Sequence, residues 1–355
     1  MNTILISKDS SKKITLLQMF SGILVLYIHC NGAKNFGLDD TSIISNICNY
    51  FTRGTSFCCV SVFALISGFL FYYSLMQNDF SIDFYKGKLK SRVKSLLVPY
   101  IFWNIVGMLY IIFLTYTPIR QYIGGTDLFE YSLKNILEGV FLYKYNGYLW
   151  YLAYLMRYVI FSPIIYFLLK NKYLAPIYLA ICFFAGVFNF DFLPEFLQET
   201  GFNTLFFFSL GAYFAINKPN VVNMRVSKNS SIISGVLYLV ICYINLVVSN
   251  NTIAMVLRVL AVICLWFVFD AFVGVEIKDI MKLSFFVYLT HGYILTAFSK
   301  VFCFVYLKTG LNSSLGALIN TFVIPIVVYF ILCVIGLTIK KYTPKLWNII
   351  SGGRG

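Results

Sequence analysis

Long apolar runs constrain this chain more than any other feature, because about 20 apolar residues in a row can cross a bilayer as a helix. Ten such runs occur, at 14–33, 55–76, 96–116, 148–169, 173–190, 202–217, 231–249, 253–273, 283–304 and 315–338. The fifth and sixth are short for a full crossing. Apolar residue types make up 59% of the chain and charged types 12%, against roughly 45–50% and 25% in soluble domains. The sequence predicts an all-α polytopic membrane protein with about ten transmembrane helices, forming one domain over 1–355.

The basic residues predict how such a chain is oriented. The 28 Lys and Arg exceed the 14 Asp and Glu, which gives a net charge of +14. In a soluble protein this excess would favour nucleic-acid binding, but in a polytopic protein Lys and Arg accumulate in cytoplasmic loops. With the N-terminus inside, 19 basic residues fall in inside segments, 6 in outside segments and 3 within spans. We therefore expect both termini in the cytoplasm, membrane lipid as a partner and no nucleic acid.

The longest connection between spans, 117–147, carries its own helical pattern. Thr126 and Asp127 form a plausible N-cap with an acidic first turn. Apolar residues then recur near helical spacing from Leu128 to Phe141. This pattern predicts a helix that lies at the outer membrane surface. An additional buried helix in a cap would give the same pattern, and the sequence leaves both open.

Both histidines of the chain, His29 and His291, fall within predicted spans. Ionisable groups are expensive inside a membrane and are candidates for function, although a lone His is about as often a hydrogen-bonded core residue. The flank of His29, IHCNG, is polar and contains Gly, which suits a helix end beside a cavity. A neutral imidazole there can act as a general base. With no second His within eight residues, no local metal site is indicated.

Three further cations lie within spans. Arg157 stands nine residues into the fourth span and, being always charged, should face a wet cavity, an anion or an acid. For Arg258 and Lys300 we expect the long side chain to extend until its charged end reaches the membrane–water interface, as Arg and Lys commonly do. We favour this over a functional role.

The predicted inside loop between the second and third spans concentrates five cations between Lys86 and Lys94. Such a loop can simply orient the chain beside anionic lipid. It can also bind a phosphate-bearing ligand through Lys88, Arg92 and Lys94. Charge alone does not separate the two interpretations.

Six stretches then follow one another in a recognisable order. They are a first span ending in His29, a second span with Arg53 and Ser67-Gly68-Phe69, the run KLKSRVKSLLVPYIFWN, the run GYLWYLAYLM with Trp150, the run LFFFSLGAYFA, and LSFFVYLTHGYIL with Ser284, Tyr288 and His291. Together they resemble the acyltransferase 3 family of integral membrane acyltransferases over nearly the whole chain.

The resemblance implies a bundle of ten transmembrane helices in a bacterial plasma membrane. It also implies transfer of an acetyl or other acyl group from acetyl-CoA to a sugar hydroxyl of a surface polysaccharide or exopolysaccharide, without a metal. The partners would be acyl-CoA and a glycan or lipid-linked glycan. His29 would be the base or acyl relay, and Lys88, Arg92 and Lys94 would hold the phosphates of CoA. The other polar candidates, with substrate-binding or structural roles, are Gln18, Arg53, Ser67, Trp150, Arg157 and His291.

One departure from the family pattern bears on the chemistry. The family usually carries Arg eleven positions before the His, where this chain has Gln18. Glutamine cannot supply that charge, so either Arg53 or Arg157 takes over its role or the chemistry has changed. The alternative is a glycan transporter or flippase of the same fold without acyl transfer.

Overall fold

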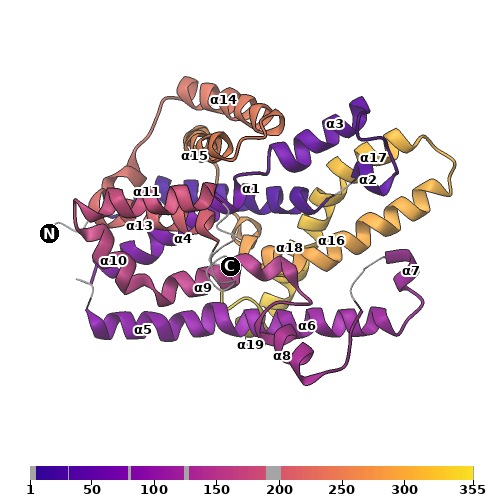
Figure 1. Ribbon diagram of the computed structural model, residues 1–355, viewed down its shortest axis with the longest axis horizontal. Helices are drawn as coiled ribbons and strands as arrows, with labels where there is room; N and C mark the ends of the chain where they lie inside the picture. The colour runs from indigo at the N-terminus through magenta and orange to yellow at the C-terminus, as the bar shows by residue number, and fades with distance from the viewer. Residues whose placement is uncertain (1–4, 31, 79–80, 124–127, 189–200, 355) are drawn as a thin grey trace. The chain divides into compact units, whose positions relative to one another are not determined.

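The structure is a computed structural model that describes residues 5–30, 32–78, 81–123, 128–188 and 201–354. Within these ranges all regular secondary structure is helical and no strand occurs (Figure 1). The predicted all-α fold is therefore confirmed. The α-helices are α1 (Lys8–His29), α2 (Gly32–Asn35), α3 (Ile43–Asn49), α4 (Cys59–Met76), α5 (Ile82–Arg92), α6 (Val98–Thr115), α7 (Arg120–Ile123), α8 (Leu133–Phe141), α9 (Trp150–Ile160), α10 (Ser162–Lys170), α11 (Leu174–Val187), α13 (Phe202–Asn217), α14 (Lys228–Val247), α15 (Asn251–Val268), α16 (Ser284–Leu307), α17 (Ser313–Phe322), α18 (Ile324–Tyr342) and α19 (Pro344–Ile350).

Among the described residues, six helical stretches are long and apolar enough to cross a membrane. They are Lys8–Asn35, Ile43–Met76, Ile82–Thr115, Lys228–Val247, Asn251–Phe272 and Ser313–Tyr342. A seventh crossing is formed if α9 and α10, which meet at an angle of 63°, count as one broken span. Pro163 near the start of α10 explains the break, because proline cannot continue the hydrogen bonding of a helix. The chain is thus a multi-pass protein, whereas the predicted number of ten spans is not confirmed.

The three remaining predicted spans are helical but differ from a full apolar crossing. The segments predicted at 173–190 and 202–217 form α11 and α13, of 14 and 16 residues. At 1.5 Å per residue these helices reach only about 21 and 24 Å, less than the roughly 30 Å hydrocarbon core. The segment predicted at 283–304 forms α16, which has 24 residues but is interrupted by polar side chains.

The segment predicted as a surface or cap helix forms α8. The expected N-cap at Thr126 and Asp127 lies outside the described residues. The helix begins at Leu133 instead, where the Ser132 hydroxyl accepts a hydrogen bond from the Asn135 amide. An apolar stripe made by Leu133, Leu137 and Phe141 is exposed. Exposure of this stripe favours the surface helix over a buried one, and its position relative to the membrane stays a prediction.

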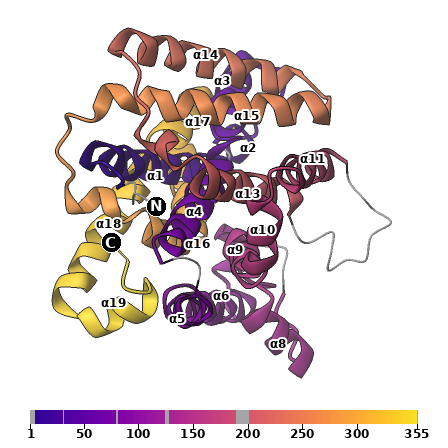
Figure 2. The same cartoon turned by 90° about the vertical axis from the view of Figure 1, so that its left-hand side faces the viewer.

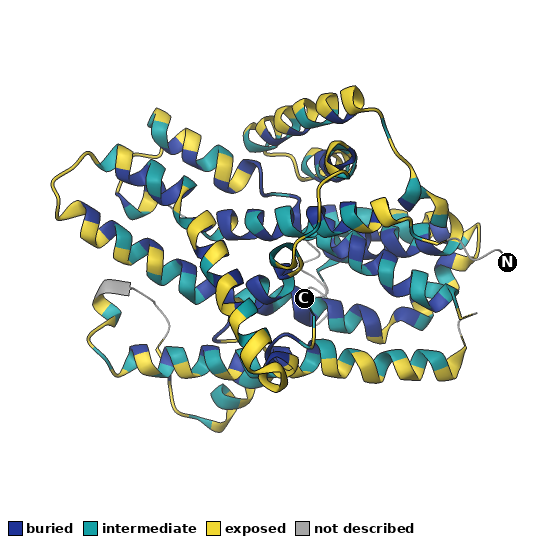
Figure 3. Cartoon of the chain, turned by 180° about the vertical axis from the view of Figure 1, so that it is seen from behind, coloured by how far each residue is buried: buried dark blue, intermediate teal, exposed yellow. Residues whose placement is uncertain are grey.

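The chain divides into two compact units, each assembled from separated stretches. Unit 1 comprises Met1–Ser21, Phe57–Arg92 and Tyr154–Ile277, and unit 2 comprises Gly22–Ser56, Val93–Ala153 and Lys278–Gly355. In unit 1, α4 packs along α13 and α14 runs beside α15 (Figure 2). In unit 2, α16 packs against α17 and α18, and α6 against α8. Buried residues gather along α4 and α13, while α14 is exposed over most of its length (Figure 3).

Two glycines allow the close approach of α4 and α13. A Cβ atom on Gly68 would collide with the backbone carbonyl of Phe208, and one on Gly211 with the backbone carbonyl of Leu65. Small residues at such crossings let the backbones of membrane helices meet. The SGF and LGAY stretches of the sequence therefore share one structural purpose, since each supplies one glycine of this contact.

A buried ion pair links the first and the last of the three stretches that form unit 1. Lys13 Nζ lies 2.7 Å from Asp270 Oδ1, and both side chains are almost fully buried. Asp270 also accepts a hydrogen bond from the Val226 amide and lies 3.5 Å from Arg225. The ammonium of Lys13 is 4.3 Å from the centre of the Trp266 ring. This set of contacts joins α1, the segment before α14, and the end of α15.

We predict that Gly211→Ala destabilises the protein by about 1–3 kcal/mol, because the added methyl group meets backbone that cannot move aside. The midpoint of thermal unfolding in detergent measures the effect. Gly87→Ala on α5 is the matched control, because open space surrounds that position. Equal midpoints for the two variants would show that the glycine contact does not matter.

Loss of the buried pair should be far more damaging than loss of an exposed one. We expect Lys13→Met to cost about 3–5 kcal/mol, since it leaves the Asp270 carboxylate buried beside only Arg225. Lys282→Met is the control, because the Lys282–Asp279 pair is exposed and such pairs contribute about 0–1 kcal/mol. There the hydrogen bond from Lys282 lowers the pKa of the Asp279 carboxyl. Comparable losses in unfolding midpoint for both variants would contradict this prediction.

Candidate functional site

Unit 2 brings the two histidines of the chain together. The ring centres of His29 and His291 lie 5.2 Å apart. A third ring, that of Tyr148, meets the His29 ring edge-on at 4.9 Å and lies 5.5 Å from His291. We call these three residues the histidine cluster. They come from the end of α1, the turn before α9 and the middle of α16, so the fold assembles the cluster from three distant parts of the sequence.

Hydrogen bonding fixes the chemical state of His291. Its Nδ1 lies 2.8 Å from the carbonyl oxygen of Tyr288. Because a carbonyl only accepts, Nδ1 carries the hydrogen and donates it, which leaves Nε2 with a lone pair in the neutral ring. Nε2 is buried and has no hydrogen-bond partner within the described part of the chain. A buried polar atom without a partner is uncommon, which distinguishes His291 from an ordinary hydrogen-bonded core histidine.

His29 is the accessible member of the pair. It is the last residue of α1 and is half-buried, whereas His291 is fully buried. A group that exchanges protons with a substrate must be reachable, and a helix end offers that access. The sequence prediction of His29 as base or acyl relay, and of His291 as a substrate-binding or structural polar residue, stays a prediction, but the two residues do share one location.

A buried polar network holds the chain just beyond His29. Asn320, on α17, donates from Nδ2 to the Ser299 carbonyl at 2.9 Å and accepts from the Ser299 hydroxyl at 2.8 Å. Asn35 donates to the same hydroxyl at 2.7 Å. The thiol of Cys30 donates to the Asn320 carbonyl at 3.2 Å. Since Cys30 directly follows His29, this network fixes the end of α1 against α16 and α17.

Tyr148 is held in place from α16. The Thr296 hydroxyl donates to the Gly292 carbonyl, so at 3.2 Å it accepts the hydrogen of the Tyr148 hydroxyl. A Cβ atom on Gly292 would collide with the Tyr148 ring. Glycine next to His291 therefore makes room for the third ring of the cluster.

The sequence missed Tyr148 and Asn320 as members of this region. Asn320 had a usable signal, because a buried amide within the apolar run 315–338 is costly unless it has partners. Tyr148 had none, since tyrosines are abundant in this chain and its position is set by contacts far away in sequence.

The other predicted site residues divide between the two units. Gln18, Ser67, Lys88, Arg92 and Arg157 belong to unit 1, and Arg53, Lys94 and Trp150 to unit 2. Arg53, in the π-helical turn Tyr50–Gly54, and Lys94 are both exposed. Trp150 packs against Tyr151, with ring centres 6.1 Å apart. Lys88 and Arg92 are one turn apart on α5, which has no buried residue, and Arg92 lies 5.6 Å from the Phe71 ring.

The polar candidates of unit 1 have varied surroundings. Arg157 lies with its guanidinium 5.5 Å from the Tyr154 ring. Gln18 and Ser67 are half-buried on α1 and α4, and Ser67 directly precedes the close contact at Gly68. Among the described residues, no three His, Cys, Asp or Glu side chains are grouped as metal ligands. Metal-free chemistry itself stays a prediction.

Comparison with known families decides the identity of the fold. The family model Acyl_transf_3, described as an acyltransferase domain, matches residues 11–340. The chain belongs to the acyltransferase 3 family. Comparisons with curated proteins and with solved structures find no significant match. Membership confirms the resemblance and supports a membrane acyltransferase in general terms.

The network beyond His29 yields a test of positioning. Asn320→Ala removes three of its hydrogen-bond contacts. We expect acyl transfer to fall about tenfold or more, because the sequence predicts His29 as the base and small displacements of such a group are costly. Asn312→Ala is the control, because Asn312 caps the same helix near its exposed start. The readout is the rate of transfer at saturating donor, with the unfolding midpoint recorded beside it. Full activity in Asn320→Ala would show that the network does not position His29.

Proposed function

We propose that this protein is a plasma-membrane O-acyltransferase that moves an acetyl group from acetyl-CoA to a sugar hydroxyl of a surface polysaccharide or exopolysaccharide. The observation that carries the proposal is the contact of His29 with His291 and Tyr148 in a chain of the acyltransferase 3 family. An accessible imidazole beside a sealed, neutral one is suited to proton transfer. Both termini are proposed to be cytoplasmic.

His29 serves as the general base in this proposal. It takes the proton of the sugar hydroxyl while the oxygen attacks the thioester carbonyl. A carbon–oxygen bond forms, the carbon–sulfur bond breaks, and CoA leaves as a thiolate that takes up a proton. A relay through an acyl group held on His29 gives the same products in two steps.

His291 supports that role through its charge state. Nδ1–H is donated to the Tyr288 carbonyl, and the buried Nε2 faces no acceptor for a second hydrogen among the described residues, so the proposal takes the ring as neutral with a lone pair on Nε2. Two imidazolium rings 5.2 Å apart in apolar surroundings would repel each other strongly. The pair therefore carries at most one positive charge, and a neutral His291 allows His29 to become the imidazolium that arises when the sugar is deprotonated.

The donor and acceptor sites are proposed from charge and residue type. Lys88 and Arg92, one turn apart, can hold CoA phosphates together with Lys94. Arg53 or Arg157 would take the place of the arginine that Gln18 replaces, and either these or Ser67 would stabilise the oxyanion. Trp150 would stack against a sugar ring. The acceptor would be a glycan or lipid-linked glycan.

We expect His29→Ala to lower acyl transfer about 100-fold or more, the usual contribution of a general base. His291→Ala should lower it less, because the base itself remains. Lys300→Gln, on the same helix as His291 and nine residues further on, is the control that should stay active.

The measurement is mass spectrometry of surface glycan from cells that make each variant, together with release of free CoA by the purified protein. An acetyl increment retained in His29→Ala would remove His29 from the mechanism. Absence of any increment and of CoA release in wild type, with glycan export altered, would favour the transporter, which the exchange of arginine for Gln18 also permits.

A further inference from the structure

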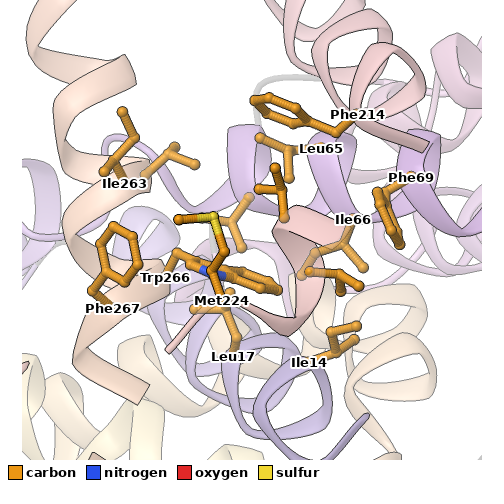
Figure 4. Close-up of a pocket in the computed structure, with 14 residues that line it drawn as sticks. Ile14, Leu17, Leu65, Ile66, Phe69, Phe214, Met224, Ile263, Trp266 and Phe267 are labelled. Atoms are coloured by element: carbon orange, nitrogen blue, oxygen red, sulfur yellow. The ribbon is translucent and has the colours of Figure 1, made fainter. Parts of the chain in front are cut away.

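Unit 1 contains a cavity that cannot satisfy a polar ligand. It has a volume of about 140 Å³ and lies among α1, α4, α13 and α15 (Figure 4). All fourteen lining residues are apolar, including Leu17, Ile66, Phe69, Val262 and Trp266. Figure 4 shows the side chains of α4 and α15 facing each other across this space, with Met224 between them. Apolar cavities of about 150 Å³ stay dry and accept hydrocarbon, so this one suits part of a hydrocarbon chain.

An uncompensated cation lies beside the cavity. Arg258 on α15 has its Nε buried without a hydrogen-bond partner, and no acidic side chain pairs with it in the described part of the chain. Its guanidinium is 6.0 Å from the Phe57 ring, and the thiols of Cys58 and Cys59 next to that ring are buried and free. The sequence predicted that Arg258 reaches an interface. Its Nε is enclosed by protein while the residue as a whole is half-exposed, so that expectation stays a prediction.

Arg258 and Cys58 each lie one helical turn before a residue that lines the cavity. Val262, which lines the cavity, follows Arg258 by one turn of α15. Val62, which also lines it, follows Cys58 by one turn of α4. Four residues of helix advance about 6 Å. The same step along either helix therefore leads from the guanidinium region into the apolar space.

The opposite end of the cavity offers no comparable charge. Lys13 contacts the ring of Trp266, a lining residue, but its ammonium is paired with Asp270 at 2.7 Å. Arg225, next to Met224, is paired with Asp9 and Asp270. An anion would find these cations already neutralised, whereas at Arg258 it would supply the missing counter-charge. A ligand that fits both features therefore has an apolar part, which occupies the cavity, and an anionic group, which lies at Arg258.

We propose that unit 1 binds an anionic membrane phospholipid, with a segment of one hydrocarbon chain in the cavity and the phosphate at Arg258. A guanidinium fork binds phosphate through two parallel hydrogen bonds, and an arginine without a partner in a membrane helix is functional by default. The neighbouring α14 exposes an apolar face that includes Ile233, Val236 and Val240, which suits a flank that meets lipid. This site is independent of the histidine cluster and of the acyl transfer proposed for it.

The test measures lipid retention by the purified full-length protein in detergent. Native mass spectrometry counts lipid bound after addition of phosphatidylglycerol or phosphatidylcholine with identical acyl chains. We expect wild type to retain phosphatidylglycerol about tenfold more strongly, because the choline ammonium of phosphatidylcholine partly neutralises the phosphate that both lipids carry, and about 1.4 kcal/mol of lost attraction is a factor of ten. Arg258→Gln should abolish the preference, and Lys300→Gln, which removes a cation from α16 in unit 2, should keep it. An unchanged preference in Arg258→Gln overturns the proposal.

Two further arms separate the parts of the site. Leu65→Trp places an indole in the cavity from a half-buried lining position and should reduce retention of both lipids several-fold. Retention equal to wild type would overturn the role of the cavity. Inorganic phosphate added in excess should not displace phosphatidylglycerol, and full displacement would indicate a site for a free anion. Should Arg258→Gln not fold, Arg258→Lys keeps the charge but loses the guanidinium fork, so the preference should be reduced and should keep its direction. A preference for phosphatidylcholine in that variant would contradict the proposal.

Discussion

The inability of hydrocarbon to form hydrogen bonds governs this structure, because every polar group inside the helices must find its partner within the protein. In unit 1 the Lys13 ammonium meets this demand with Asp270 at 2.7 Å. In unit 2 the amide of Asn320 meets it with Ser299. Both pairs join segments more than 20 residues apart in sequence, so the few polar groups of an apolar chain fix which helices are neighbours. Apolar packing alone would specify this less sharply.

The structure explains why some of the family-like stretches carry the residues that they do. Gly68 and Gly211 permit one close helix contact, so two separate stretches encode the same feature. The late stretch acts on its own histidine, since the Tyr288 carbonyl fixes the hydrogen on His291. The Tyr288 hydroxyl also accepts from the Leu152 amide in the stretch that contains Trp150. Several of these stretches are therefore in contact with one another in the folded chain.

Local patterns predicted the helices well, because apolar runs and caps act over a few residues. The flank of His29 likewise pointed to a helix end, which the structure has at that residue. The predicted number of spans is not confirmed, because α11 and α13 are too short to reach across hydrocarbon and α16 is interrupted by polar side chains. Hydropathy does not report where a helix stops. Tyr148 could not be predicted, since its place depends on Gly292 and Thr296, more than 140 residues away.

Unsatisfied groups are most informative where the missing partner would cost most. Several buried atoms lack a hydrogen bond in the described chain, among them the hydroxyls of Ser21 and Tyr329. A neutral hydroxyl forfeits about 1–3 kcal/mol in this way, which a stable fold tolerates. A guanidinium is different because it is charged, and enclosing part of it without a counter-ion costs more than losing a neutral hydrogen bond. His291 is fully buried, and its ring lies 5.2 Å from that of His29, so the residue near it belongs to the fold. Arg258 is half-exposed and therefore calls for a partner outside the fold, whereas Lys13 and Asn320 have partners and serve the fold itself.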